Sequence, residues 1–149
     1  MAAKNKMDKI SRITRSENMR RIHSRHTKPE LITRKLVSQL GIKYRLHPKN
    51  ILGSPDIINR KHKFAIFVHG CFWHQHTKCK YCHLPKSRKS YWTPKLRRNV
   101  QRDKRNVALL KKNGWNVLII WECQLHKPLK AKSRLTRFFK MVYAVRNKH

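Results

Sequence analysis

Residues 68–83 read VHGCFWHQHTKCKYCH and hold four histidines, three cysteines and a Phe-Trp pair. A structural zinc ion takes four Cys or His ligands in a tetrahedron, and thiolates suit it best. Two ligand sets fit the spacing: Cys71, Cys79, Cys82 and Cys123, or the same set with His76 in place of Cys82. Four buried free cysteines are the alternative, but they would leave a long aperiodic loop without an organiser. The sequence therefore predicts a zinc site and leaves one ligand open.

The chain has only six acidic residues, so each one is informative. Two lie near the N-terminus, and four remain for acid-dependent chemistry: Glu30, Asp56, Asp103 and Glu122. Asp56 follows Gly-Ser-Pro and begins a predicted strand. Magnesium takes one or two carboxylates together with phosphate oxygens, so Asp56 fits such a ligand. A turn-forming Asp is the plainer alternative. Glu122 is expected at a strand end on the surface.

Asp103 and Glu30 each have a structural and a chemical interpretation. Asp103 interrupts an apolar helical stripe formed by Leu96, Val100, Val107 and Leu110. It should therefore point inward and need a partner, either a histidine or one of the many arginines. Glu30 follows Thr27 by three positions, which is the spacing of a capping box, and it fits a catalytic role equally well.

Composition restricts the partner of this chain. Lys and Arg number 38 against 6 Asp and Glu, which gives a formal net charge of 38 − 6 = +32. A phosphate polyanion is the natural counterpart of such a charge. A hydrophobic content of 39% and four tryptophans favour a packed fold over a disordered basic tail. The sequence has neither an apolar run of about 20 residues nor a signal peptide, so we expect a soluble, intracellular, cytoplasmic protein.

The length of 149 residues predicts one domain, 29–149, preceded by a basic arm, 1–28. The expected elements, in chain order, are a short arm helix near 14–17, a helix from Thr27 to Gly41, strands at 42–47, 56–59 and 64–68, a helix from Thr93-Pro94 to about 112, a strand at 115–121 and a helix at about 129–146. Strands 56–59 and 64–68 should form a hairpin, and the apolar run 115–121 should be covered on both faces.

Strand, loop, helix and strand follow one another from 64 to 121, which is the order of a βαβ unit. Strands 64–68 and 115–121 should therefore be parallel, with their carboxyl ends at the same edge of the sheet. Cys71 follows one strand end and Cys123 follows the other, so the topology should bring them together.

Five segments, GSPDI, VHGCFWH, PKSRKSYW, NVQRDKRN and GWNVLIIWEC, occur in the order and spacing of the very-short-patch repair (Vsr) DNA mismatch endonucleases. The resemblance covers about residues 10–125. It implies a restriction-endonuclease-like α/β fold, with a central mixed β-sheet flanked by helices and a structural zinc site. It also implies a magnesium-dependent enzyme that nicks one strand of double-stranded DNA 5′ to the thymine of a T:G mismatch, the lesion left by deamination of 5-methylcytosine.

The resemblance also assigns catalytic roles. Asp56 would bind magnesium, with the backbone carbonyl of Val68 as a further ligand. The family has threonine at this last position, and a carbonyl contact survives the change to valine. His74 would be the general base that activates water, oriented by Asp103, and His69 would contact the region of the scissile phosphate.

Glu30 would assist the hydration shell of the magnesium. Phe72, Trp73 and Trp92 would form an aromatic wedge beside the mismatch, with Met19 of the arm approaching from the other groove. A wobble pair stacks poorly, so unstacking it costs less than unstacking a matched step, while each ring recovers ~1–3 kcal/mol by stacking on a base. Core packing is the alternative role for these rings.

For zinc, the ligands implied by the resemblance are Cys71, His76, Cys79 and Cys123. This sequence departs from the family by one extra residue between His76 and Cys79 and by the additional thiol of Cys82, which stays a possible substitute for His76. The family further implies a monomer that works with mismatch-repair proteins and a DNA polymerase. Two other functions are open: a restriction enzyme of this fold that cuts matched DNA, and a zinc-stabilised nucleic-acid-binding module without catalysis.

Overall fold

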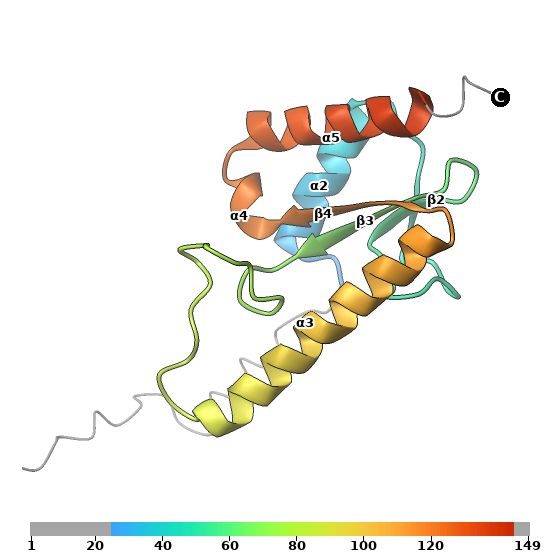
Figure 1. The fold of residues 1–149 in the computed structure, drawn as a ribbon. Coiled ribbons are helices and arrows are strands. Elements are labelled where there is room, and N and C mark those ends of the chain that lie inside the picture. Colours follow the sequence, from blue (N-terminus) through green and yellow to red (C-terminus); the bar gives the residue numbers. More distant parts are fainter. Residues whose placement is uncertain (1–24, 145–149) are drawn as a thin grey trace, which may run out of the picture.

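The computed structural model describes residues 25–144 and contains one mixed sheet with flanking helices (Figure 1). The elements, in chain order, are α2 (Lys28–Gln39), β1 (Arg45–Leu46), β2 (Ile57–Asn59), β3 (Phe64–His69), α3 (Lys89–Lys112), β4 (Asn116–Trp121), α4 (Glu122–Leu125) and α5 (Pro128–Ala144). The expected α/β class, with a central mixed sheet, is confirmed.

The four strands lie in the order β1-β2-β3-β4. Strands β1 and β2 pair antiparallel, as do β2 and β3, so the predicted hairpin is confirmed. Strands β3 and β4 pair parallel, in register from Phe64 opposite Asn116 to His69 opposite Trp121. The predicted parallel pair is therefore also confirmed, and the segments that follow His69 and Trp121 leave the same edge of the sheet. Strand β1 is much shorter than the predicted strand 42–47.

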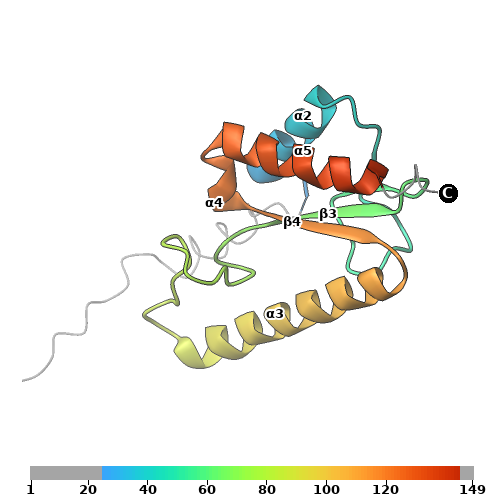
Figure 2. The ribbon, with the colours of Figure 1, turned by 45° about the horizontal axis from the view of Figure 1, so that its top comes forward.

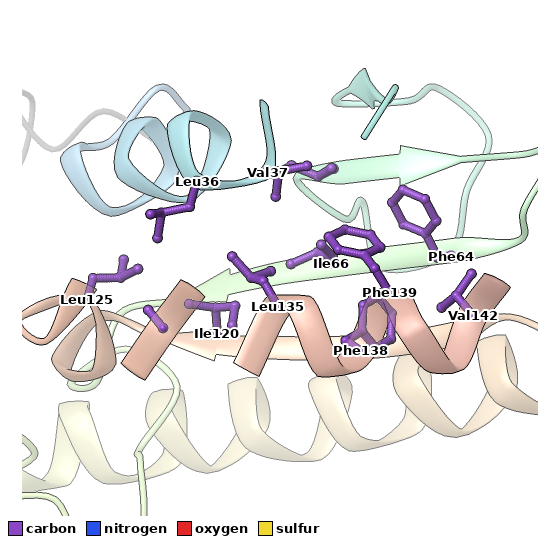
Figure 3. Packing of buried hydrophobic residues seen from close by; sticks show 12 residues of the cluster. Leu36, Val37, Phe64, Ile66, Ile120, Leu125, Leu135, Phe138, Phe139 and Val142 are labelled. Atoms are coloured by element: carbon purple, nitrogen blue, oxygen red, sulfur yellow. The ribbon is translucent and has the colours of Figure 1, made fainter. Parts of the chain in front are cut away.

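Helices α2 and α5 cover one face of the sheet, and α3 covers the other (Figures 1 and 2). Alternate residues of β3 enter two separate cores, because side chains of a strand point to opposite faces. Phe64 and Ile66 pack with Leu135, Phe138 and other residues of α2 and α5 (Figure 3). The second core contains Ile58, Ala65, Phe67 and Leu110. Side chains of β4 also enter both cores, as the sequence predicted for a strand covered on two faces.

Helix α2 begins where the capping pattern predicts. The hydroxyl of Thr27 accepts a hydrogen bond from the Glu30 N–H at 3.5 Å, and a Glu30 carboxylate oxygen accepts from the His26 N–H at 2.9 Å. The helix ends before Gly41, whose φ of 70° lies in the left-handed region that glycine adopts without strain. The capping pair thus fixes the position of Glu30 at the start of the domain.

Helix α3 starts earlier than expected. The Thr93-Pro94 pair predicted its first turn, but the helix begins at Lys89 and Pro94 lies inside it. The N–H groups of Tyr91 and Trp92 both donate to the Arg88 carbonyl, and the Trp92 ring contacts aromatic residues of the loop before the helix. This long-range packing supports an additional turn that the local pattern did not indicate. The end at Lys112, before Gly114, agrees with the prediction.

The sequence predicts that the last helix has an apolar stripe of Leu135, Phe138, Phe139, Val142 and Val145, and α5 buries the first four of these residues. Val145, the short helix near 14–17 and the wedge residue Met19 lie outside the described residues. Among the helices within residues 25–144, none is long and apolar enough to cross a membrane.

Candidate active site and metal centre

A cleft of about 740 Å³ opens at the carboxyl end of β3, between α2 and α3. All four acidic residues of the described part of the chain line it: Glu30, Asp56, Asp103 and Glu122. His69 and His74 line the same cleft. The acidic side chains of residues 25–144 are thus gathered in one cleft of a very basic chain. Glu122, which we expected at a strand end on the surface, also lines this cleft.

Asp56 lies immediately before β2 and is held against β3. Its N–H donates to the Ile66 carbonyl at 3.0 Å, and its Oδ2 accepts from the Val68 N–H at 2.7 Å. In an extended strand the N–H and C=O of one residue point to the same side, so the Val68 carbonyl faces Asp56 too. Burial raises the pKa of Asp56 to about 6, because the charged form loses hydration. A cation at the free carboxylate oxygen would restore the charged form.

His74 and Asp103 form the closest polar contact in the cleft. The Nδ1 atom of His74 lies 2.5 Å from Oδ2 of Asp103, so Asp103 points inward to a histidine. Burial alone would raise the pKa of Asp103, but the hydrogen bond from His74 outweighs it and the pKa lies below its ordinary value. Because Nδ1 is engaged, Nε2 is the ring nitrogen available to a substrate, and within residues 25–144 it has no partner.

His69 stacks on His74, with ring centroids 3.8 Å apart and planes within 6°. Burial, together with the neighbouring His74, lowers the pKa of His69 to about 3. His69 is therefore neutral over the physiological range. It can support the His74 ring and offer one hydrogen-bond donor without adding charge.

Glu30 reaches the cleft as well as capping α2. Its carboxylate accepts hydrogen bonds from the His26 N–H, the Thr27 hydroxyl and the Arg34 guanidinium, at 2.9, 3.0 and 2.9 Å. Ligand-capable atoms of Glu30, His47 and Asp56 lie within 4.8 Å of one another. Sequence reasoning did not single out Arg34 or His47. The i,i+4 spacing of Glu30 and Arg34 on a helix was the available signal for their ion pair.

A second polar cluster gathers four residues: Cys71, His76, Cys79 and Cys123. Their potential ligand atoms all lie within 4.8 Å of one another. The Nδ1 atom of His76 is 3.3 Å from Sγ of Cys123 and 3.8 Å from Sγ of Cys71. Three thiols and one imidazole are a ligand set that tetrahedral zinc accepts. The prediction that topology unites Cys71 and Cys123 is confirmed.

Cys82 lies outside this four-residue group, although its N–H donates to the Cys79 carbonyl at 3.0 Å. His76 is held in place by stacking on Trp121, with centroids 4.1 Å apart. Burial raises the pKa of Cys71 to about 12, so without a metal this thiol keeps its proton. A zinc ion would displace that proton, which couples metal binding to the packing of the loop.

The proposed wedge rings form one cluster. The ring centroid of Phe72 lies 5.1 Å from that of Trp73 and 5.7 Å from that of Trp92. The Lys95 ammonium lies 5.8 Å from the Trp73 ring and 5.4 Å from the Trp92 ring. All three rings are partly exposed rather than buried in either core. This position suits contact with a partner better than core packing.

The fold and the cleft define an α/β DNA endonuclease, and comparison with known proteins agrees. The family model for the DNA mismatch endonuclease Vsr matches residues 7–80. The DNA mismatch endonuclease Vsr of Escherichia coli is 39% identical over 118 residues, which cover 79% of this chain and 75% of that protein. This protein belongs to the Vsr family of DNA mismatch endonucleases.

Other relatives and one solved structure point the same way. The type II nicking enzyme V.XorIIP of Xanthomonas oryzae is 42% identical, covering 79% of this chain and 86% of that enzyme. The type II nicking enzyme V.NmeAIP of Neisseria meningitidis is 40% identical, covering 86% and 91%. The catalytic domain of the homing endonuclease I-Bth0305I superimposes with a TM-score of 0.57 at 25% identity, covering 78% of this chain and 97% of that domain.

Proposed function

We propose that this endonuclease nicks one strand of duplex DNA 5′ to the thymine of a T:G mismatch, in a magnesium-dependent hydrolysis. The observation that supports it most is the gathering of every described carboxylate with two histidines in one cleft of a chain with net charge +32. The basic surface attracts DNA phosphates, and the acidic cleft can hold the cation that a phosphodiester needs before water can attack it.

Magnesium would be held by the free oxygen of Asp56 and the Val68 carbonyl. Both are hard oxygen ligands of the kind that magnesium prefers, and few protein ligands leave room for phosphate oxygens and water. When bound, the ion would polarise a phosphate oxygen and stabilise charge on the leaving oxygen. Asp56 is held against β3 by its bond to the Val68 N–H, so it supplies this ligand without rearranging.

His74 is the proposed general base. Its Nδ1–H is fixed on Asp103, so the Nε2 lone pair can accept the proton of the attacking water. Asp103 then stabilises the imidazolium that forms, and stacked His69 keeps the ring from turning while facing the scissile phosphate. The new P–O bond forms as the backbone P–O bond breaks, so one strand is nicked. Glu30 acts on the hydration shell of the magnesium rather than as a direct ligand.

Phe72, Trp73 and Trp92 are the proposed mismatch wedge, together with Met19. A T:G wobble pair is easier to unstack than a matched pair, and stacking on each ring returns ~1–3 kcal/mol. The mismatch is therefore recognised through its deformability. The Cys/His cluster is proposed to hold zinc and so to fix the loop that carries both the wedge and His74.

A nicking assay on defined duplexes tests this function. The purified protein and magnesium are incubated with duplexes that carry T:G or T:A at one position, each strand labelled separately. Nicking of the thymine strand of the T:G duplex alone supports the proposal. Cleavage of both strands of matched DNA would indicate a restriction enzyme, and binding without cleavage would indicate a non-catalytic module. The proposed setting is the bacterial cytoplasm, with mismatch-repair proteins and a DNA polymerase completing the repair.

A further inference from the structure

Arg34 is a buried cation behind the cleft wall, where it contacts the cleft residue Glu30. It projects from α2, and only 9% of the residue is exposed. Its Nη2 lies 2.9 Å from Oε2 of Glu30 and 2.9 Å from Nε2 of His47, while Nη1 lies 2.8 Å from Nδ1 of His26. One guanidinium thus binds a carboxylate and two imidazoles at the same time.

Arg34 holds two of the three members of the Glu30, His47 and Asp56 group. A guanidinium can only donate hydrogen bonds, so the Nε2 lone pair of His47, 2.9 Å from Nη2 of Arg34, accepts one from it. A metal ion would bind this same lone pair, so Arg34 engages the atoms that would otherwise coordinate a metal.

Asp56 differs from the other two members of the group. Within residues 25–144 it forms no ion pair, and its recorded side-chain hydrogen bond is the one from the Val68 N–H. The nearby carboxylate of Glu30 is already neutralised by Arg34. An added divalent ion therefore meets one uncompensated carboxylate at this end of the cleft.

We infer that the guanidinium of Arg34 takes the place of a metal ion at Glu30 and His47. A divalent ion that enters this part of the cleft is then left with Asp56 as its side-chain ligand. Removing the guanidinium would open a second cation site at Glu30 and His47, with the Asp56 carboxylate shared between the two ions. The inference rests on the proposed function only in taking Asp56 as the metal-binding carboxylate. It makes Arg34 a positioning residue, because it acts through Glu30 and His47 and not on the substrate.

The ligand set of the latent site predicts which ion would enter it. Two carboxylates and an imidazole nitrogen suit a transition metal, whereas magnesium prefers oxygen ligands alone. Manganese accepts both kinds of ligand and is paramagnetic. It is therefore the probe of choice for both sites.

Manganese binding to the full-length, zinc-loaded protein without DNA tests the inference, with free ion measured by electron paramagnetic resonance. We expect one ion bound in the cleft of the native protein and two in Arg34→Met. The matched control Arg34→Lys keeps the positive charge and should bind one. Two ions in the native protein, or one or none in a folded Arg34→Met variant, would overturn the inference.

His47→Ala supplies a second test that does not depend on the folding of Arg34→Met. If Arg34 engages the Nε2 atom of His47, this substitution leaves the single manganese ion bound with unchanged affinity. A tenfold or greater loss of affinity would show that His47 is a direct ligand and would contradict the inference. Failure of the proposed function is distinguishable, because Asp56→Asn would then retain the manganese ion that it is expected to lose.

Discussion

The Cys/His cluster and the carboxylate cleft lie at the same edge of the sheet but offer different sets of potential ligands. The cluster has three thiols and an imidazole, enough ligands to surround one zinc ion completely. The cleft presents a carboxylate with a free oxygen beside a strand carbonyl, so an ion held there would keep open positions for substrate. Cys71 of the cluster and His74 of the cleft belong to one loop. A metal bound at the cluster would therefore also help to fix the position of His74.

The two regions also differ in how their ionisable side chains are stabilised. In the cluster, thiols such as Cys71 stay protonated until a metal arrives, because burial raises the pKa. In the cleft, the carboxylates of Glu30 and Asp103 already have partners, Arg34 and His74. Asp56 forms no ion pair within the described residues, and burial raises its pKa. On this basis the cluster would depend on a bound metal for its order, whereas protein contacts already position the cleft residues.

The largest expected effect is loss of the zinc cluster. Cys123→Ser should lose zinc and much of its folded structure, because apparent zinc-binding energies of about 10 kcal/mol or more are available to such sites. Circular dichroism melting and metal analysis would measure both. The matched control is Cys82→Ser, which lies outside the cluster and should keep zinc and melting temperature. Equal losses in the two variants would contradict the assigned ligand set.

The second prediction concerns the stability of the metal-free cleft. Asp56 has a pKa of about 6 in the fold against an ordinary value of 3.8, so the folded state binds the proton more tightly than the unfolded state. The free energy of unfolding should fall as pH rises through this window, by about 3 kcal/mol, and stay low above it.

Comparison with Asp56→Asn isolates this contribution. Asp103, whose pKa is lowered, has the opposite slope, and its effect cancels in the difference between the two proteins. Urea unfolding at pH 4 and pH 7, with zinc but no magnesium, should show Asp56→Asn gaining stability over the native protein at pH 7. A difference that does not change with pH would argue that Asp56 is hydrated or paired.

The third prediction concerns the role of Asp103 in orienting the His74 ring. Asp103→Asn removes the carboxylate that fixes Nδ1–H and should lower the nicking rate by about a hundredfold, within the range of general acid–base contributions. Affinity for the T:G duplex should change little. Single-turnover nicking and gel-shift titration would measure the two quantities. An unchanged nicking rate would remove Asp103 from its proposed role.

The smallest effect is expected in the aromatic cluster. Trp73→Ala removes one stacking surface worth ~1–3 kcal/mol, so the preference for T:G over T:A binding should fall by roughly tenfold. Tyr91→Ala is a suitable comparison, since Tyr91 neighbours Trp92 but was not assigned to the wedge. If both variants lose equal discrimination, the wedge is defined too narrowly.

Much of this architecture could be predicted from the sequence because it depends on local patterns and topology. The capping residues gave the start of α2, and the apolar run 115–121 gave β4. The βαβ order placed Cys71 beside Cys123. The early start of α3 could not be predicted, since it depends on packing of Trp92 against Phe72 and Trp73, which are distant from it in the sequence. The cluster around Arg34 was missed for a similar reason: His47 joins it only once β1 pairs with β2.

The central claim is that Asp56 supplies the metal ligand on which strand cleavage depends. The most direct measurement compares magnesium-dependent nicking of a T:G duplex by the native protein and by Asp56→Ala, with binding affinity measured in parallel. The account predicts a loss of about a thousandfold or more in nicking, equivalent to ~4 kcal/mol of transition-state stabilisation, with affinity largely intact. Nicking retained by Asp56→Ala at a rate near that of the native protein would contradict it.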